Sequence, residues 1–166
     1  VPAAVGSEIR LGDIGIEAIA AKHETFDEGP DGFPHVGYLI RLGGVTVYNA
    51  GDTVPYDGLV ETLAARAIDL AFLPINGRDV FRTGRGIIGN MDYREAAEIA
   101  ARIGADTVVP VHYGMFAGNT VPPGHFVSYL ADHHPGVQAH VLGRNRLYLY
   151  SSPRSMLAAV SNIDDA

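Results

Sequence analysis

Residues 37–53 read GYLIRLGGVTVYNAGDT, two short apolar segments joined by a pair of glycines and followed by Gly-Asp-Thr. The segments on either side of Gly43-Gly44 are rich in β-branched and aromatic residues, and the glycine pair is typical of a tight hairpin turn. Asp52 comes just past the end of the second segment. This stretch therefore predicts an antiparallel pair of strands that delivers a carboxylate to the end of a sheet.

Strands and helices alternate on both sides of this hairpin. Alternating apolar residues predict two strands before it, and short buried apolar runs predict further strands after it. Asp92 is placed to cap one clear helix, which Gly104 ends. This alternation predicts an α/β fold with helices packed on a sheet. The predicted strands are 9–11, 14–21, 37–42, 45–50, 70–75, 107–111, 137–142 and 146–150, and the predicted helices are 57–66, 93–103, 124–134 and 155–160.

Composition narrows the classes of function. The chain is 47% hydrophobic and 19% charged, as expected for a globular protein. Its net charge of −7 disfavours a nucleic-acid partner, because such binders usually present a basic surface. No apolar run approaches the roughly 20 residues of a membrane span, and the N-terminus lacks the pattern of a signal peptide, so we expect a cytoplasmic protein with no membrane partner. Because the chain has no cysteine, any metal would have to be held by His, Asp or Glu.

Three residues with metal-ligand chemistry share one position in the predicted fold. His23, Asp52 and His112 each follow a predicted strand, where functional side chains gather in α/β sheets. Imidazole and carboxylate suit Zn, Mn or Fe. Each residue also has an ordinary explanation: a lone histidine after a strand is more often a surface or capping residue, and the aspartate of Gly-Asp-Thr is a turn former. Their coincidence at three strand ends leaves the metal site and the structural roles evenly balanced.

Five motifs together resemble a known family. VYNAGDT (47–53), VVPVHYGMF (108–116) and IEAIAAKH (16–23) are similar to the strand-end metal motifs of metallo-β-lactamase-fold hydrolases. LAFLPINGRD (70–79) and GNMDYREAAEIA (89–100) resemble the L-ascorbate-6-phosphate lactonase-like branch of that superfamily. Several linked motifs in the right order make this resemblance much more specific than a lone Gly-Asp-Thr.

The resemblance covers only one half of the family's fold. It implies half of an αββα sandwich, a mixed β-sheet with helices on one face. The His-x-His-x-Asp-His cluster that should precede the strand ending at His23 does not occur among the seven histidines. Residues 1–150 would then be the C-terminal half of the domain, and residues 151–166 a tail with a short helix. The missing N-terminal half would be a partner, the other sheet face would expose apolar area, and homo-oligomer formation is left open.

The resemblance also implies roles for the three ligand residues. His23 would bind one metal ion, His112 the second, and Asp52 would bridge both and orient a hydroxide as the catalytic residue. The cofactors would be two divalent ions, Zn or Mn. The small-molecule substrate would be a lactone or ester of a sugar acid, with or without phosphate. The alternative is a non-catalytic fragment, or a binding or assembly module that keeps the fold without a complete metal site.

The segment 76–90, NGRDVFRTGRGIIGN, is the candidate for contacts to substrate. It has many glycines and arginines and no periodicity, so we predict a functional loop. Arginine suits a phosphate or carboxylate because its guanidinium binds such groups in a bidentate manner. Solvation or pairing with a nearby acid is an equal alternative for Arg78 and the favoured one for Arg82 and Arg85. The predicted substrate-binding residues are Asn76, Arg78 and Asn90.

Overall fold

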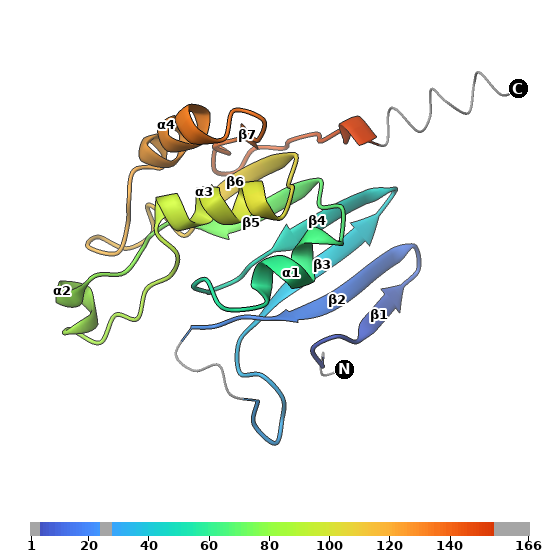
Figure 1. The fold of residues 1–166 in the computed structure, drawn as a ribbon, viewed down its shortest axis with the longest axis horizontal. Coiled ribbons are helices and arrows are strands. Elements are labelled where there is room, and N and C mark those ends of the chain that lie inside the picture. Colours follow the sequence, from blue (N-terminus) through green and yellow to red (C-terminus); the bar gives the residue numbers. More distant parts are fainter. Residues whose placement is uncertain (1–3, 24–27, 155–166) are drawn as a thin grey trace, which may run out of the picture.

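The structure, a computed structural model, describes residues 4–23 and 28–154 of the chain. Its centre is a seven-stranded sheet whose strands follow one another in sequence order (Figure 1). The strands are β1 Glu8–Leu11, β2 Ile14–Ala20, β3 Val36–Leu42, β4 Val45–Asn49, β5 Leu70–Pro74, β6 Thr107–Val111 and β7 Gln138–Ala139.

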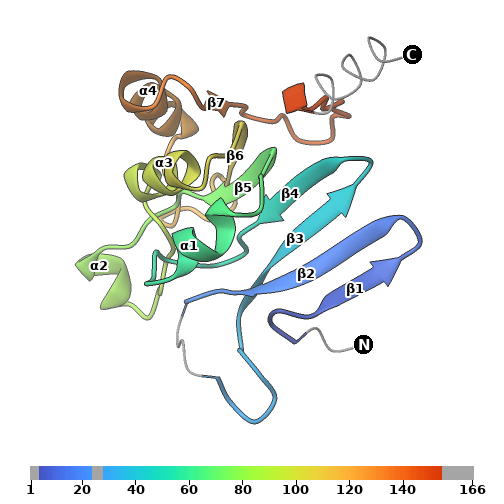
Figure 2. The same ribbon diagram turned by 45° about the vertical axis from the view of Figure 1, so that its right-hand side comes forward.

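The sheet is mixed, as predicted. β1 to β4 pair antiparallel, and β4 to β7 pair parallel. Short turns are sufficient between antiparallel strands, whereas each parallel connection needs a crossover, and here each crossover carries a helix. Because right-handed crossovers that all advance in one direction lie on one side of a sheet, α1, α3 and α4 share one face (Figures 1 and 2). The helices are α1 Leu59–Ala64, α2 Val80–Thr83, α3 Tyr93–Arg102 and α4 Pro123–His133.

The core lies between the sheet and these helices. Leu39 of β3 and Tyr48 of β4 are directly paired and buried on the helix side of the sheet. Helix α4 contributes Phe126 and Leu130 to the same cluster and packs against α3. The further large, fully buried side chains are Leu59, Leu63, Ile68, Leu73, Ile75, Met91, Ile103 and Val108.

The opposite sheet face carries apolar side chains that are only partly buried. Ile16 pairs with Ile40, and Ile40 pairs with Val47, so the three form a row across β2, β3 and β4. Each is of intermediate burial, whereas their neighbours Leu39 and Tyr48 on the helix side are buried. The described part of the chain thus leaves an apolar row incompletely covered, as expected for a sheet with helices on one face.

Three predicted elements differ from the structure. The predicted strand 146–150 is absent: Leu147 and Leu149 are 90% and 95% exposed, and no strand of the described chain lies alongside to supply the hydrogen bonds that a strand needs. The predicted strand 137–142 shortens to β7, which pairs with β6 only at Thr107 and Val108. The first predicted helix, 57–66, is shorter in the structure: α1 begins at Leu59, and its N-cap is Gly58, the neighbour of Asp57, with no side-chain hydrogen bond.

Two further predictions concern the loop 76–90 and the C-terminal tail. The loop 76–90 contains one helical turn, α2, which was not predicted. The predicted tail helix 155–160 lies outside the described residues. Within residues 4–23 and 28–154, no helix has the length and apolar character required to cross a membrane.

Candidate functional site

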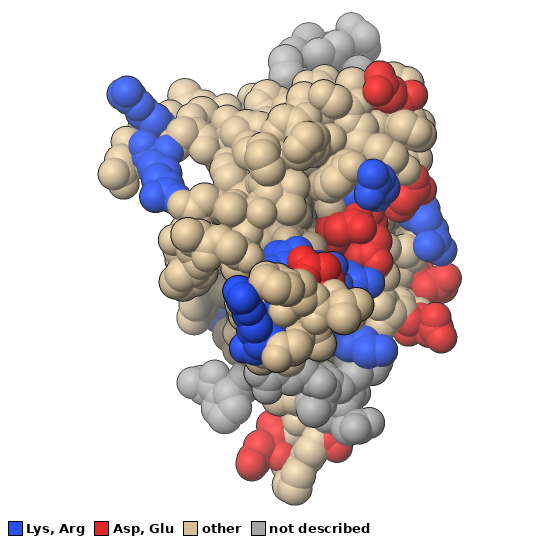
Figure 3. All heavy atoms as spheres, turned by 90° about the vertical axis from the view of Figure 1, so that its left-hand side faces the viewer, with Lys and Arg blue, Asp and Glu red and all other residues tan. Residues whose placement is uncertain are grey.

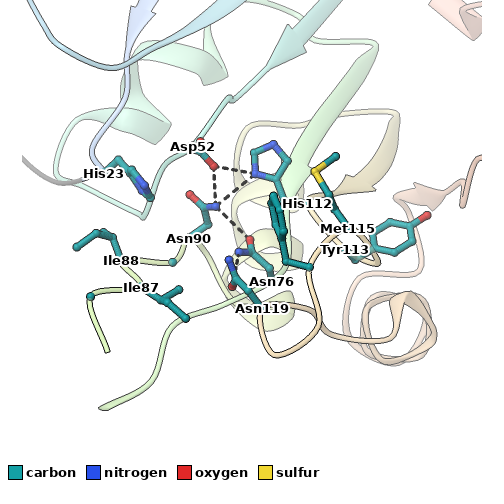
Figure 4. A pocket seen from close by; sticks show the side chains of 13 residues that line it. His23, Asp52, Asn76, Ile87, Ile88, Asn90, His112, Tyr113, Met115 and Asn119 are labelled. Carbon is teal, nitrogen blue, oxygen red and sulfur yellow. Dashed lines mark hydrogen bonds and ion pairs between the residues drawn. The ribbon is translucent and has the colours of Figure 1, made fainter. Parts of the chain in front are cut away.

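The topology brings four strand ends to one edge of the sheet. β2 is antiparallel to β3, which is antiparallel to β4, so β2 runs in the same direction as β4, β5 and β6. The carboxyl ends of all four strands therefore meet at the same edge, where α/β proteins bind ligands. His23, Asp52, Asn76 and His112 follow these ends, and all four line one pocket of about 470 Å³ (Figure 4).

Asp52 and His112 are in direct contact at the centre of this pocket. Asp52 Oδ1 lies 2.9 Å from His112 Nδ1, and Asn90 Nδ2 donates to the same Asp52 oxygen at 2.8 Å. The two side chains are 52% and 35% exposed, so the pair faces an open pocket. The structure thus brings two of the three predicted ligands into contact, and their role as ligands stays a prediction.

His23 lines the same pocket from the end of β2 (Figure 4). Its Nδ1 is buried and has no hydrogen-bond partner within residues 4–23 and 28–154. The ring of His35 meets the His23 ring edge-on at a centroid distance of 5.4 Å. A buried imidazole nitrogen without a partner is costly unless a ligand satisfies it, so His23 remains available as a ligand.

The threonine of Gly-Asp-Thr ties the chain before His23 to the Asp52 loop. Thr53 is fully buried, and its Oγ1 accepts a hydrogen bond from Lys22 N at 3.0 Å. Its backbone oxygen accepts from Met91 N, also at 3.0 Å. Thr53 thereby joins three segments that are distant in sequence, a role that the sequence analysis did not assign to it.

Two backbone conformations at the site are unusual. His112 has φ 59°, one of three positive values among the described non-glycine residues, which costs free energy that the surrounding structure must offset. Gly51 has φ 63°, and a Cβ there would lie 2.9 Å from Val36 O. The chain therefore leaves β4 and β6 through conformations that aim Asp52 and His112 at each other.

The two predicted substrate-binding asparagines are buried. Asn76 and Asn90 are each 3% exposed, and both reach the pocket wall. Asn90 Nδ2 lies 3.1 Å from Asn76 Oδ1 and 3.3 Å from His112 Nδ1. Their contacts are thus with the Asp52–His112 pair and with each other, and direct contact with substrate stays a prediction.

The arginines of the 76–90 loop are paired within the protein. Arg78 binds Glu95 of α3 through two hydrogen bonds of 2.6 Å and does not line the pocket. Arg82 Nε lies 2.6 Å from Asp79 Oδ2, as the favoured alternative for this residue anticipated. The guanidinium of Arg85 lies over the Phe81 ring. A substrate contact for Arg78 remains a prediction that requires Glu95 to release it.

The structure adds one polar pocket residue, Asn119, that the sequence did not indicate. Asn119, 43 positions after Asn76, accepts a hydrogen bond from Asn76 Nδ2 at 2.9 Å. No local pattern could have singled it out, because its partner is distant in sequence. The apolar part of the wall consists of Ile87, Ile88, Tyr113, Met115 and Phe116.

The donor set fits a metal ion only in part. The chemistry of the three predicted ligands is suitable, and His23 presents an unsatisfied buried nitrogen. Yet within residues 4–23 and 28–154 no three His, Asp or Glu side chains converge closely enough to hold an ion. The described chain thus brings Asp52 and His112 together in a pocket that His23 also lines, and a metal site there stays a prediction.

Comparison with known proteins gives the family of the chain. The family described as "Beta-lactamase superfamily domain" matches residues 1–113, which end just after His112. The chain belongs to the metallo-β-lactamase superfamily. A UPF0173 metal-dependent hydrolase of Methanoculleus marisnigri is 35% identical over 120 residues, covering 69% of this chain and 49% of the relative. That of Geobacillus thermodenitrificans is 38% identical over 101 residues, covering 61% and 39%.

Two solved structures share this fold. Igni18, a metallo hydrolase of Ignicoccus hospitalis, has a TM-score of 0.72 at 24% identity, covering 91% of this chain and 60% of that protein. CmlA, a diiron β-hydroxylase of Streptomyces venezuelae, has a TM-score of 0.62 at 17% identity, covering 86% and 33%. The chain spans about half the length of the curated relatives it matches. The predicted half-fold of this superfamily is confirmed.

Proposed function

We propose that this member of the metallo-β-lactamase superfamily supplies one half of the active site of a metal-dependent hydrolase. The observation that carries the proposal is the contact between Asp52 and His112 in a pocket that His23 also lines. These are the residues that the superfamily resemblance assigns to the metal. The names of the relatives, metal-dependent hydrolases, support the same class of reaction.

His23, Asp52 and His112 would hold divalent ions, Zn or Mn, and two in the complete site. When bound, such ions supply Lewis acidity, which activates water near neutral pH and polarises the oxygen of an ester or lactone. Asp52 would keep its position through Oδ1, which contacts His112 and Asn90, and would turn its other oxygen to the ligand. The apolar wall of the pocket would keep bulk water away from the reacting bond.

The proposed substrate is a lactone or ester of a small sugar acid. The phosphorylated version, which the resemblance to the lactonase-like branch suggests, has less support, because no Lys or Arg is among the described residues that line the pocket. On the side of the molecule where α2 lies, acidic side chains stand beside the basic ones, and a wide neighbouring area carries neither (Figure 3). This surface therefore offers no purely basic patch. A cationic phosphate site would have to come from the other half.

The test is Asp52→Ala in the chain joined to the second half of the fold that its relatives carry. We expect metal-dependent hydrolysis of lactone or aryl ester substrates to fall by ~10³-fold or more, because the variant loses a ligand and the group that orients water. The exposed Asp57→Ala serves as the control and keeps full activity. Full activity in Asp52→Ala would refute the assignment.

A second candidate function is that of a binding or assembly module without catalytic activity. It is favoured by the failure of three donors to converge within residues 4–23 and 28–154. Metal analysis of the purified chain after equilibration with Zn or Mn separates the two. Stoichiometric metal that Asp52→Ala abolishes supports the hydrolase, and no bound metal supports the module.

A further inference from the structure

The amide nitrogen of Asn90 has more neighbours than it has protons. Asn90 Nδ2 lies 2.8 Å from Asp52 Oδ1, 3.1 Å from Asn76 Oδ1 and 3.3 Å from His112 Nδ1. An amide NH₂ donates two hydrogen bonds, and the two shorter contacts are to oxygens that can only accept. The Asn90 protons are therefore committed to Asp52 and Asn76, and none is left for His112.

The number of Asn90 protons determines which atom carries the proton in the contact between His112 and Asp52. His112 Nδ1 and Asp52 Oδ1 are 2.9 Å apart, and a carboxylate oxygen and an unprotonated ring nitrogen would repel each other at that distance. Because Asn90 does not supply a proton to Nδ1, His112 itself must carry one there and donate it to Asp52. In the neutral ring the lone pair is then on Nε2, the atom that a ligand would use.

The orientation of Asn90 is determined by a chain of three amides, Asn76, Asn90 and Asn119, which we call the amide relay. Asn90 donates to Asn76 Oδ1, and Asn76 Nδ2 donates to Asn119 Oδ1 at 2.9 Å. Each amide therefore presents its oxygen to the preceding nitrogen, all in the same sense. Turning any one amide over would place two oxygens or two NH₂ groups in contact.

Arg82 sets the sense of the relay. Its Nη1 donates to Asn119 Oδ1 at 2.9 Å and to Asn76 O at 2.7 Å. A guanidinium has no acceptor, so the Asn119 oxygen must face it. The Arg82 side chain is only 13% exposed and is held by Asp79, the N-cap of α2, through Nε at 2.6 Å. A cation that is mostly shielded from solvent at one end thus orients every amide up to Asp52.

The amide oxygen of Asn90 is left without a hydrogen bond from the described residues. Asn90 Oδ1 is buried and has no partner within residues 4–23 and 28–154, and it points to the His23 side of the pocket (Figure 4). The relay thereby sacrifices a hydrogen bond at Oδ1 in order to keep Nδ2 on Asp52. Turned over, the amide would place its oxygen against the acceptor oxygens of Asp52 and Asn76, so these two contacts keep Nδ2 where it is.

We propose that Arg82, acting through the amide relay, is a positioning residue that fixes the polarity of the Asp52–His112 pair. It keeps His112 protonated at Nδ1, so that His112 Nε2 and Asp52 Oδ2 face the ligand. The inference rests on the proposed function for the nature of that ligand. The tautomer itself is a property of the chain without any metal.

The first measurement uses the unaltered chain. Long-range proton–nitrogen NMR spectra at pH 8, assigned with a His112→Asn variant, report which ring nitrogen of His112 carries the proton. We expect the Nδ1–H tautomer in the metal-free chain. The Nε2–H tautomer would overturn the inference, whatever the variants do.

The second measurement removes the cation. Arg82→Met keeps an unbranched, largely apolar side chain and abolishes the donors. We expect a mixture of His112 tautomers and Zn affinity weakened by ~10–100-fold, the usual cost of losing a partner that orients a ligand. Arg82→Lys, which still only donates, should retain most of both properties. Arg85→Met is the matched control, because Arg85 lies over Phe81 on the same loop.

The outcomes separate this inference from the proposed function. If the unaltered chain binds Zn and folded Arg82→Met keeps both its affinity and the single tautomer, the relay has no positioning role and the proposed function stands. If the unaltered chain binds neither Zn nor Mn, the proposed function fails, while the tautomer spectra still decide the relay. Circular dichroism establishes that each variant is folded.

Discussion

At the scale of single residues, the site depends on positions where the backbone leaves a strand in an unusual way. Gly51 lies between β4 and Asp52 with a positive φ, and its Cα is close to the backbone of Val36. Gly37 sits opposite, where an added Cβ would lie 2.7 Å from Asn49 O. The two glycines allow the ends of β3 and β4 to approach each other, and this approach sets the position of Asp52.

Gly51→Ala tests this dependence. The added methyl group would contact Val36 O at 2.9 Å, and φ 63° disfavours any residue with a side chain. We expect a loss of about 1–3 kcal/mol in the free energy of unfolding, measured by urea denaturation. Gly136→Ala, with open space around its Cβ and no positive φ, should change stability by less than ~0.5 kcal/mol. Equal effects of the two would contradict the strain argument.

The sequence indicated which residues lie at the pocket, but it did not indicate which side chains contact one another there. His23, Asp52 and His112 were found because each follows a strand, and the strand direction then brought them to one edge. The partners of Asn90 and Arg78 were not predicted, because a side chain selects its partner after distant segments have been brought together. Glu95, which binds Arg78, is 17 positions away on another element.

At the scale of elements, helix α3 anchors the loop that carries the amide relay. Asp92 and Glu95 form a capping box at its first turn, as the sequence indicated for the cap. Glu95 also binds Arg78 in the loop, and Asn76 bridges to Asp92. The N-terminus of α3 thus holds the start of the 76–90 loop.

Glu95→Gln should remove the pH dependence of the stability that this anchor contributes to the fold. Burial raises the pKa of Glu95, but hydrogen bonds from Arg78 and from Asp92 N outweigh it and leave the pKa below its usual value. A carboxyl whose pKa is lower in the folded than in the unfolded protein stabilises the fold at pH values above its unfolded-state pKa, about 4.3. This stabilisation is lost as the pH falls through the folded-state pKa. The stability difference between wild type and variant should therefore be about 0.2–1 kcal/mol at pH 7 and vanish near pH 3.

Thermal unfolding followed by circular dichroism between pH 3 and pH 7 measures this difference. Glu61→Gln, an exposed site on α1, provides the control for removal of one negative charge. A difference between wild type and Glu95→Gln that does not change with pH would show that the Arg78 pair makes no contribution.

At the scale of the whole molecule, the segment after β7 returns to the amino ends of the central parallel strands. Tyr150 Oη lies 3.1 Å from Asp69 O and 3.0 Å from Asp106 Oδ2. Ser152, which is 1% exposed, donates to Asp69 Oδ1, and Arg154 donates to Gly104 O at 2.9 Å. Residues 150–154 therefore close the end of the sheet opposite the pocket.

Tyr150→Phe tests this closure. Burial and the hydrogen bond with Asp106 raise the pKa of Tyr150 to about 12, so the hydroxyl is protonated at neutral pH. Its removal leaves Asp106 with one donor fewer, and we expect a loss of about 1–2 kcal/mol in the free energy of unfolding. Tyr38→Phe, on the partly exposed face of β3, should have little effect in the same urea titration. A stability equal to that of wild type would show that residues 150–154 do not depend on this contact.

The sequence by itself determined most of the elements and the position of three candidate ligands at strand ends, because strand alternation, paired glycines and a capping aspartate act over a few neighbouring residues. It also determined the family, since the order of motifs is a property of the chain. Only the tertiary structure decided that Arg82 faces Asn119, that Arg78 is bound to Glu95 and that residues 146–150 form no strand. These outcomes depend on which segments become neighbours in space, and local preferences carry no information about such long-range partners.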